Sequence, residues 1–106
     1  MEYIRALDLR DSIASGEKWT VIDIREAYEL DICSVSFAVH IPMAEVAERI
    51  AEIPQDGKVA IMCKSGRRAM AVTNLLIQDF NRDNVLILEG GILAWAEEVE
   101  PHLETY

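Results

Sequence analysis

Nearly unbroken runs of apolar residues alternate along the chain with stretches whose apolar residues recur every three or four positions. The unbroken runs are typical of strands buried on both faces of a sheet, and they lie at residues 21–24, 38–41, 59–62 and 85–88. The spaced stretches predict helices, and they lie at residues 8–14, 26–30, 44–50, 69–76 and 92–99. This alternation predicts an α/β fold, in which a small, mostly parallel sheet of four to five strands carries helices on both faces.

The same pattern bounds the elements and the number of domains. Asp8 is expected to cap the first helix, Gly16 to follow its end, and Pro101 to end the last helix. No internal repeat, low-complexity tract or linker rich in proline and glycine divides the 106 residues, of which 51% are hydrophobic. A chain of this size builds one core and is too short for two, so we expect a single domain over residues 1–106.

Acidic side chains outnumber basic ones by 19 to 10, which gives a formal net charge of −9. This charge disfavours nucleic acids and anionic membrane surfaces as partners, because both are bound through Lys and Arg. The longest run without Asp, Glu, Lys or Arg, residues 32–44, has thirteen residues, whereas a membrane span needs roughly 20. No signal peptide is visible, and two cysteines make no disulfide framework, so the expectation is a cytoplasmic protein.

One short segment departs from the acidic background, because Lys64, Arg67 and Arg68 lie within five positions directly after Cys63. The segment follows the strand predicted at residues 59–62, and ligands of parallel sheets bind outside the carboxyl ends of the strands. The start of the next helix offers unpaired backbone N–H groups that attract anions, and Gly66 allows the backbone to curl around a common centre. We therefore predict that Cys63 is a reactive thiolate; the alternative is an inert cysteine at the end of a buried strand.

The length of this loop bears on which group reacts there. Protein tyrosine phosphatases separate their cysteine from a phosphate-binding arginine by five residues, which would put that arginine at position 69, where this chain has Ala69. The loop from Cys63 to Arg68 is one residue shorter. It therefore favours a smaller electrophilic centre or a sulfur-bound oxyanion over a phosphomonoester.

In these features the chain resembles the rhodanese (thiosulfate sulfurtransferase) homology domain, and the resemblance covers nearly all of it. The matching landmarks are residues 21–26 followed by Tyr28 and Glu29, residues 38–42, the strand and loop at 59–68, and residues 85–95 with their Gly-Gly and Trp ending. The resemblance implies a sulfurtransferase that takes a sulfane sulfur from thiosulfate or a similar small anionic donor. The sulfur would be held as a persulfide on Cys63 and passed to a thiophilic acceptor, such as cyanide, a thiol or a protein.

Under this resemblance Cys63 is the nucleophile and the remainder of its loop binds the donor, through Lys64, Ser65, Gly66, Arg67 and Arg68. No cofactor is implied, and no metal is expected, because no His/Cys spacing resembles a zinc site. Other functions stay open. The chain could be a sulfur carrier or relay module that a partner protein loads, a phosphatase or arsenate reductase, or a catalytically silent regulatory domain. In the family, a seven-residue loop goes with phosphatases and arsenate reductases, whereas the loop of this chain has six residues.

The chain departs from the family at residues 33–38, where both glycines and the histidine of the usual Gly-His-Ile-x-Gly-Ala are absent. We expect this turn to be built differently. Cys33 is either a packing residue or a resolving thiol, and His40 could serve as a base for Cys63, although a loop-stabilised thiolate needs none.

A further set of residues is expected to be structural or solvated rather than catalytic. Asp23 lies at a strand end, and an Arg–Glu ion pair of Arg25 and Glu26 would hold loops in place. Trp19 and Trp95 are expected to pack, and His102 to be solvated.

Overall fold

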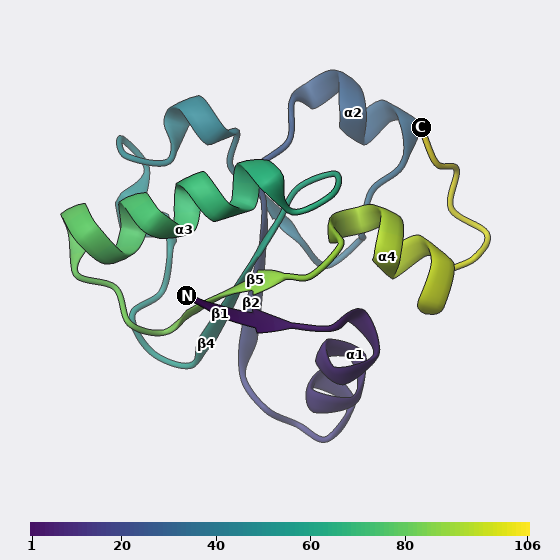
Figure 1. The fold of residues 1–106 in the computed structure, drawn as a ribbon, viewed down its shortest axis with the longest axis horizontal. Coiled ribbons are helices and arrows are strands. Elements are labelled where there is room, and N and C mark those ends of the chain that lie inside the picture. Colours follow the sequence, from purple (N-terminus) through teal and green to yellow (C-terminus); the bar gives the residue numbers. More distant parts are fainter.

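A five-stranded parallel sheet with helices on both faces organises the computed structural model, which describes residues 1–106 (Figure 1). The strands are β1 (Glu2–Ile4), β2 (Trp19–Asp23), β3 (Val39–His40), β4 (Lys58–Met62) and β5 (Val85–Leu88). The helices are α1 (Ala6–Ala14), α2 (Ala27–Ile32), α3 (Arg67–Phe80) and α4 (Gly91–Glu98). Every neighbouring pair in the order β1-β5-β4-β2-β3 is parallel, which confirms the predicted α/β architecture.

Two apolar clusters, one on each face of the sheet, form the core. Successive residues of β4 alternate between them, so that Val59 and Ile61 contribute to one cluster and Ala60 and Met62 to the other. The first cluster lies under α3, and the second lies under α1 and α4, on the opposite side of the sheet in Figure 1. This burial on both faces explains why the central strands are nearly unbroken apolar runs. None of the helices combines the length and the apolar composition that a bilayer crossing requires.

Three local expectations were wrong. Strand β1 was not predicted, because it has only three residues and is held by its pairing with β5, opposite residues 86–88. Helix α1 begins at Ala6 with Arg5 at the N-cap position, so Asp8 lies in the first turn instead of capping it. A carboxylate in that turn still favours the helix, because it faces the positive end of the helix dipole.

The helix predicted at residues 44–50 is the third error. The segment forms two short 3₁₀ turns, η1 (Met43–Glu45) and η2 (Ile50–Glu52), closed by bonds from Glu45 N to Pro42 O and from Ile53 N to Ile50 O. Within residues 43–50 only Val46 is fully buried. A single anchor gives too little apolar contact to stabilise a helix of several turns, so the chain turns tightly around it.

The turn at residues 33–38 is built without glycine, as its sequence required. Ala38 N donates to Val35 O at 3.1 Å, and no residue of this segment has a positive φ. Val35 is buried, and the Phe37 ring packs edge-on against Trp95, with their centroids 5.8 Å apart. Because the backbone stays in regions open to any residue, the family's glycines are dispensable here.

Candidate active site

Cys63 directly follows β4, the central strand of the sheet, and the segment that it begins leads into α3 (Figure 1). Gly66, just before α3, has a φ of +105°, which allows the backbone to fold back over the cysteine. The loop is fixed from the other side by the start of α4. Ile92 N donates to Cys63 O at 2.8 Å, and Leu93 N donates to Lys64 O at 3.2 Å.

The contact between the loop and α4 leaves no room for a side chain at position 91. A Cβ added to Gly91 would lie 2.5 Å from Cys63 O and closer still to Lys64 O. Gly91 also has a φ of +61°. The glycine is therefore required by close backbone approach as well as by conformation.

The Cys63 sulfur is enclosed and receives two backbone hydrogen bonds. Gly66 N donates to Sγ at 3.0 Å and Ala69 N donates at 3.4 Å, while the residue is 1% exposed. Both donors belong to the junction between the loop and α3, where amide groups lack partners within the helix. Negative charge on the sulfur is favoured at such a position. The sequence anticipated the Gly66 region, and the contribution of Ala69 follows only from the structure.

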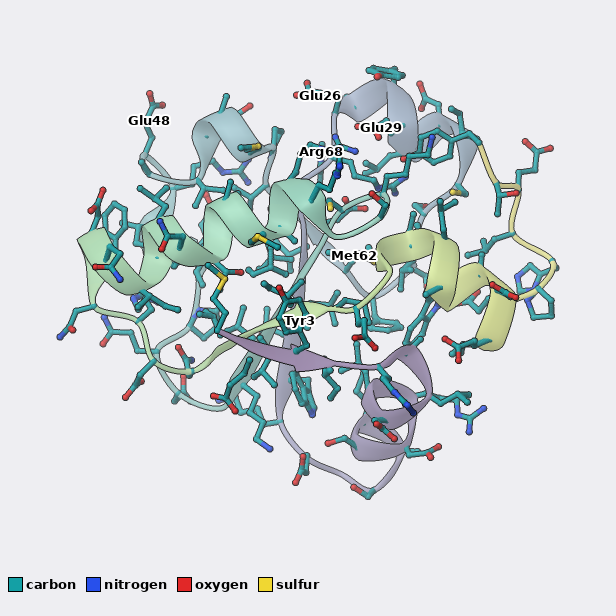
Figure 2. The ribbon with its side chains drawn as sticks, in the orientation of Figure 1. Tyr3, Glu26, Glu29, Glu48, Met62 and Arg68 are labelled. Atoms are coloured by element: carbon teal, nitrogen blue, oxygen red, sulfur yellow. The ribbon has the colours of Figure 1, made fainter.

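The three cations of the loop have different surroundings. Arg68 makes two hydrogen bonds to Glu29 of α2, Nη1 to Oε2 at 2.7 Å and Nη2 to Oε1 at 2.8 Å (Figure 2). Lys64 places its Nζ 4.4 Å from the ring centroid of Tyr106. Arg67 is exposed and takes part in no ion pair, and Ser65 is exposed as well. Arg67 is thus the cation of the loop that is open to solvent.

Glu29 is the acidic centre of the site and was not identified as a functional residue from the sequence. It is 2% exposed, and it accepts hydrogen bonds from Arg68, from Glu26 N at 2.7 Å and from the Tyr106 hydroxyl at 2.6 Å. The hydrogen bonds from Arg68 outweigh burial and, with that from Tyr106, lower the pKa of Glu29 to about 2. In turn Glu29 raises the pKa of Arg68, and the nearby Cys63 adds to this effect. Arg68 therefore lies within electrostatic range of the sulfur while it is held by Glu29.

Arg25 joins β2, α2 and the C-terminus, and its Nη1 donates to the backbone O of Glu29 at 3.3 Å. Its side chain is fully buried, and it donates to both oxygens of Asp23, to Cys33 O at 2.8 Å and to the Tyr106 hydroxyl at 3.0 Å. Burial works to lower the pKa of Arg25, but the hydrogen bonds to Asp23 and Tyr106 raise it overall. The expected structural role is supported, with one correction. Arg25 pairs with Asp23, and Glu26 instead caps α2 through reciprocal bonds with Glu29.

The structure does not bring Cys33 or His40 to the Cys63 sulfur. Cys33 is buried in the core cluster on the opposite face of the sheet, which favours the packing role. His40 is engaged through Nε2 with Arg25 O at 2.7 Å. The remaining residues have the expected surroundings: Trp95 is buried, and His102 is exposed with Glu100 3.4 Å away.

Tyr106 belongs to the site, but no sequence feature predicted this. It reaches Glu29 and Arg25 across 77 and 81 positions of sequence. A single tyrosine in an acidic tail carries no motif, and no spacing relates it to the loop. Glu29 could have been selected as a weak candidate, because it and Tyr28 are among the residues that resemble the family. No feature of the sequence indicated that Arg68 is its partner.

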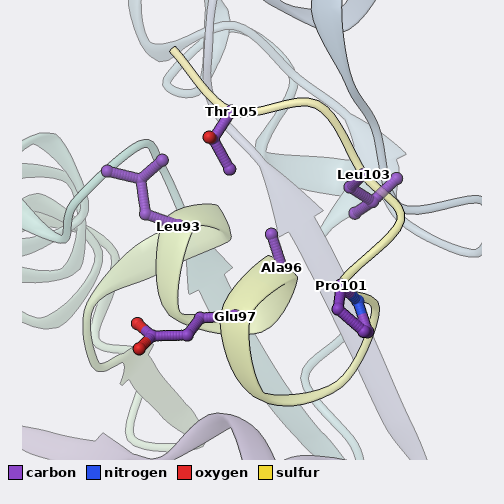
Figure 3. A pocket seen from close by; sticks show the side chains of 6 residues that line it. All are labelled: Leu93, Ala96, Glu97, Pro101, Leu103 and Thr105. Carbon is purple, nitrogen blue, oxygen red and sulfur yellow. The ribbon is translucent and has the colours of Figure 1, made fainter.

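A pocket of about 470 Å³ lies elsewhere, between α4 and the C-terminal segment (Figure 3). It is lined by Leu93, Ala96, Glu97, Pro101, Leu103 and Thr105. None of these residues belongs to the loop that carries Cys63, but Leu93 N donates to Lys64 O, so the pocket adjoins the candidate site without including the sulfur.

Comparisons with known proteins agree with this arrangement. The profile of a family described as the Rhodanese-like domain matches residues 6–98. The chain is 35% identical over 94 residues to the putative sulfurtransferase YtwF of Bacillus subtilis, and the match covers 88% of each chain. A rhodanese-related protein from Thermoplasma volcanium has a similar crystal structure, with a TM-score of 0.82, 34% identity and coverage of 95% of this chain and 96% of that chain.

A longer relative is also similar. The chain is 34% identical over 101 residues to the probable adenylyltransferase/sulfurtransferase MoeZ of Mycobacterium tuberculosis. The match covers 93% of this chain and 26% of that protein, so the chain spans about a quarter of MoeZ.

Proposed function

This chain belongs to the rhodanese-like domain family, and we propose that it is a sulfurtransferase that carries a sulfane sulfur as a persulfide on Cys63. The observation that supports this most directly is the pair of amide hydrogen bonds from Gly66 and Ala69 to the Cys63 sulfur. The same donors can stabilise the negative charge of a thiolate before loading and of a persulfide after it. The sulfurtransferase names of YtwF and MoeZ support sulfur as the transferred atom.

The proposed reaction has two displacement steps. In the first, the Cys63 thiolate attacks the outer sulfur of thiosulfate; a new S–S bond forms, the S–S bond of thiosulfate breaks, and sulfite leaves with the bonding electron pair. In the second, a nucleophile such as cyanide attacks the terminal sulfur of the persulfide. Thiocyanate forms, and the electron pair of the broken bond returns to Cys63 as thiolate. No proton transfer is needed in either step, which fits a site where His40 is engaged elsewhere.

A small anion is the donor class that the site suits. Cys63 is almost fully enclosed, and Arg67 and Lys64 lie on the loop around it. The loop from Cys63 to Arg68 has six residues, and a phosphomonoester would need a wider cradle. We therefore propose thiosulfate or a similar sulfur-bound oxyanion as donor and a thiol or a protein as an acceptor.

A sulfur-relay role is the second candidate, and the match to MoeZ is the observation that favours it. There a region similar to this chain makes up about a quarter of a longer protein that is also named an adenylyltransferase. A relay module would receive its persulfide from a partner protein and turn over thiosulfate slowly. Rapid loading by a cysteine-desulfurase-type donor together with slow thiosulfate turnover would favour the relay.

We treat residues 1–106 as one domain in this proposal, because a single sheet spans β1 to β5. We also place the function in the cytoplasm. The cycle requires a reduced thiol on Cys63, both cysteines are free, and thiols stay reduced in that compartment.

Intact-protein mass spectrometry after incubation with thiosulfate and desalting tests the proposal. We expect the mass to rise by one sulfur atom, the gain to disappear in Cys63→Ser and to persist in the matched control Cys33→Ala. Subsequent cyanide should remove the added mass and release thiocyanate. An unmodified Cys63 that also resists alkylation would contradict the proposal, and hydrolysis of an aryl phosphate would revive the phosphatase alternative.

A further inference from the structure

The C-terminal segment, residues 99–106, runs from the end of α4 back to α2 (Figure 1). It is tethered along its length. Trp95 Nε1 donates to Glu100 Oε1 at 2.9 Å, and Leu103 and Tyr106 pack against the core cluster under α1 and α4. Between these anchors the segment spans the pocket of Figure 3. The anchored segment therefore fixes the position of Tyr106 beside the Cys63 loop.

Tyr106 contacts the polar centre of the site through two different parts of its side chain. Its hydroxyl donates to Glu29 Oε1 at 2.6 Å and accepts from Arg25 Nη1 at 3.0 Å. Its ring lies under Lys64, whose Nζ is 4.4 Å from the ring centroid. Burial raises the pKa of Tyr106, so the phenol keeps its proton at neutral pH and remains a hydrogen-bond donor to Glu29.

These contacts connect one residue to two of the three loop cations. Lys64 is held directly by the ring, and Arg68 is held through Glu29, which receives hydrogen bonds from both Arg68 and Tyr106. Long cationic side chains lose conformational freedom when they bind an anion. A side chain that is already fixed loses less, which strengthens binding without a new contact to the ligand.

We propose that Tyr106 is a positioning residue for the Cys63 loop, which fixes Lys64 through its ring and Arg68 through Glu29 in the arrangement that receives an anionic donor. The identity of the donor rests on the proposed function, whereas the arrangement of the loop does not. Because Tyr106 bonds to Glu29 and Arg25 and not to the sulfur, its removal should weaken donor binding more than it slows the chemical step.

The test compares Tyr106→Leu, which removes hydroxyl and ring, with Tyr106→Phe, which keeps a ring for Lys64. Tyr28→Leu is the matched control, because Tyr28 is also a tyrosine near Glu29 in sequence but is 67% exposed. With cyanide as acceptor, we expect Tyr106→Leu to raise the KM for thiosulfate about three- to tenfold and to leave kcat within about twofold. Tyr106→Phe should raise KM by a smaller factor, at least about twofold, and Tyr28→Leu should leave it unchanged.

A second measurement needs no sulfur transfer. Iodoacetate and iodoacetamide both alkylate a cysteine thiolate, but only the first is an anion, so the ratio of their rates at Cys63 reports how well the loop receives negative charge. We expect this ratio to fall in Tyr106→Leu by a factor similar to the rise in KM. Since access affects both reagents, an opened site alone would leave the ratio unchanged.

The outcomes separate this proposal from the proposed function. If thiosulfate fails to load a wild-type Cys63 that still alkylates, the proposal of thiosulfate as the donor fails, and the alkylation ratio still decides the role of Tyr106. An unchanged ratio and an unchanged KM in a folded Tyr106→Leu would overturn the positioning role, as would an equal change in Tyr28→Leu. If Tyr106→Leu does not fold, Tyr106→Phe decides on the same two readouts.

Discussion

Arg68 and Glu29 face each other through two parallel hydrogen bonds of 2.7 and 2.8 Å, although 39 positions of sequence separate them. The pair joins the start of α3 to α2, and it is asymmetric. The Glu29 side chain is 3% exposed, whereas that of Arg68 is 33% exposed. The carboxylate therefore depends on its protein partners, while the guanidinium can also reach water.

Replacing Glu29 by Gln should destabilise the fold, because an amide cannot accept the hydrogen bonds of Arg68, Tyr106 and Glu26 N together. We expect the free energy of unfolding at neutral pH to fall by roughly 2–4 kcal/mol, somewhat less than for a fully buried pair. Urea denaturation measures it. The matched control is Glu48→Gln, since Glu48 is exposed and lies far from Glu29 in Figure 2. A Glu29→Gln protein as stable as the Glu48→Gln protein would contradict this expectation.

The low pKa of Glu29 makes part of the stability dependent on pH. Because folding lowers this pKa from about 4.5 to about 2, the stabilisation is fully present above pH 4.5 and is lost as the pH falls towards 2. Its full size is roughly 3 kcal/mol. We expect the difference in unfolding free energy between wild type and Glu29→Gln to be constant above about pH 5 and to shrink below it. A difference that stays constant down to pH 2 would show that the carboxylate is not responsible.

Local patterns sufficed for the elements whose own residues are buried at nearly every position. The apolar run at β4 predicted both a central strand and the position of Cys63 at its carboxyl end. Patterns failed where the stabilising contacts lie elsewhere in the chain. Strand β1 exists through its pairing with β5, and residues 43–52 fold around Val46 rather than along a helical face.

The same distinction applies to the site. Cys63, Gly66 and the two arginines lie in one contiguous loop, so their charge and conformation could be assessed together from the sequence. Arg67 and Arg68 are adjacent and chemically identical, yet the structure leaves one exposed and pairs the other with Glu29. Successive helical positions point in different directions, and the partner that separates their roles comes from a distant element.

Gly91→Ala tests whether the start of α4 holds the Cys63 loop in place. The new methyl group would overlap Cys63 O and Lys64 O, so the loop must move. We expect a loss of about 2–4 kcal/mol in unfolding free energy and at least about a tenfold slower loading of Cys63 by thiosulfate. Denaturation and mass spectrometry measure the two effects.

Gly16→Ala is the control for backbone strain alone. Gly16 also has a positive φ, of +95°, but a Cβ there would meet nothing within 4 Å. Its cost should be confined to stability, at about 1–2 kcal/mol, with loading unchanged. If thiosulfate loaded Cys63 at the same rate in Gly91→Ala and in Gly16→Ala, the contact between α4 and the loop would not shape the site.

Replacing either arginine of the loop should slow loading by thiosulfate, but the two loading defects should depend differently on salt. Arg67 is exposed and unpaired, so Arg67→Ala removes long-range attraction for an anionic donor and little else. We expect loading by thiosulfate to slow about two- to fivefold at low ionic strength and the difference to vanish near 1 M salt. Stability should change by less than about 0.5 kcal/mol.

Arg68→Ala leaves the buried Glu29 carboxylate without its main partner and should cost roughly 2–4 kcal/mol of stability, with a loading defect that salt does not remove. Rates of mass gain measured across a salt series, with urea denaturation of each variant, distinguish the two. If Arg67→Ala were the less stable protein, or if its defect persisted at high salt, the division of roles between these neighbours would be wrong.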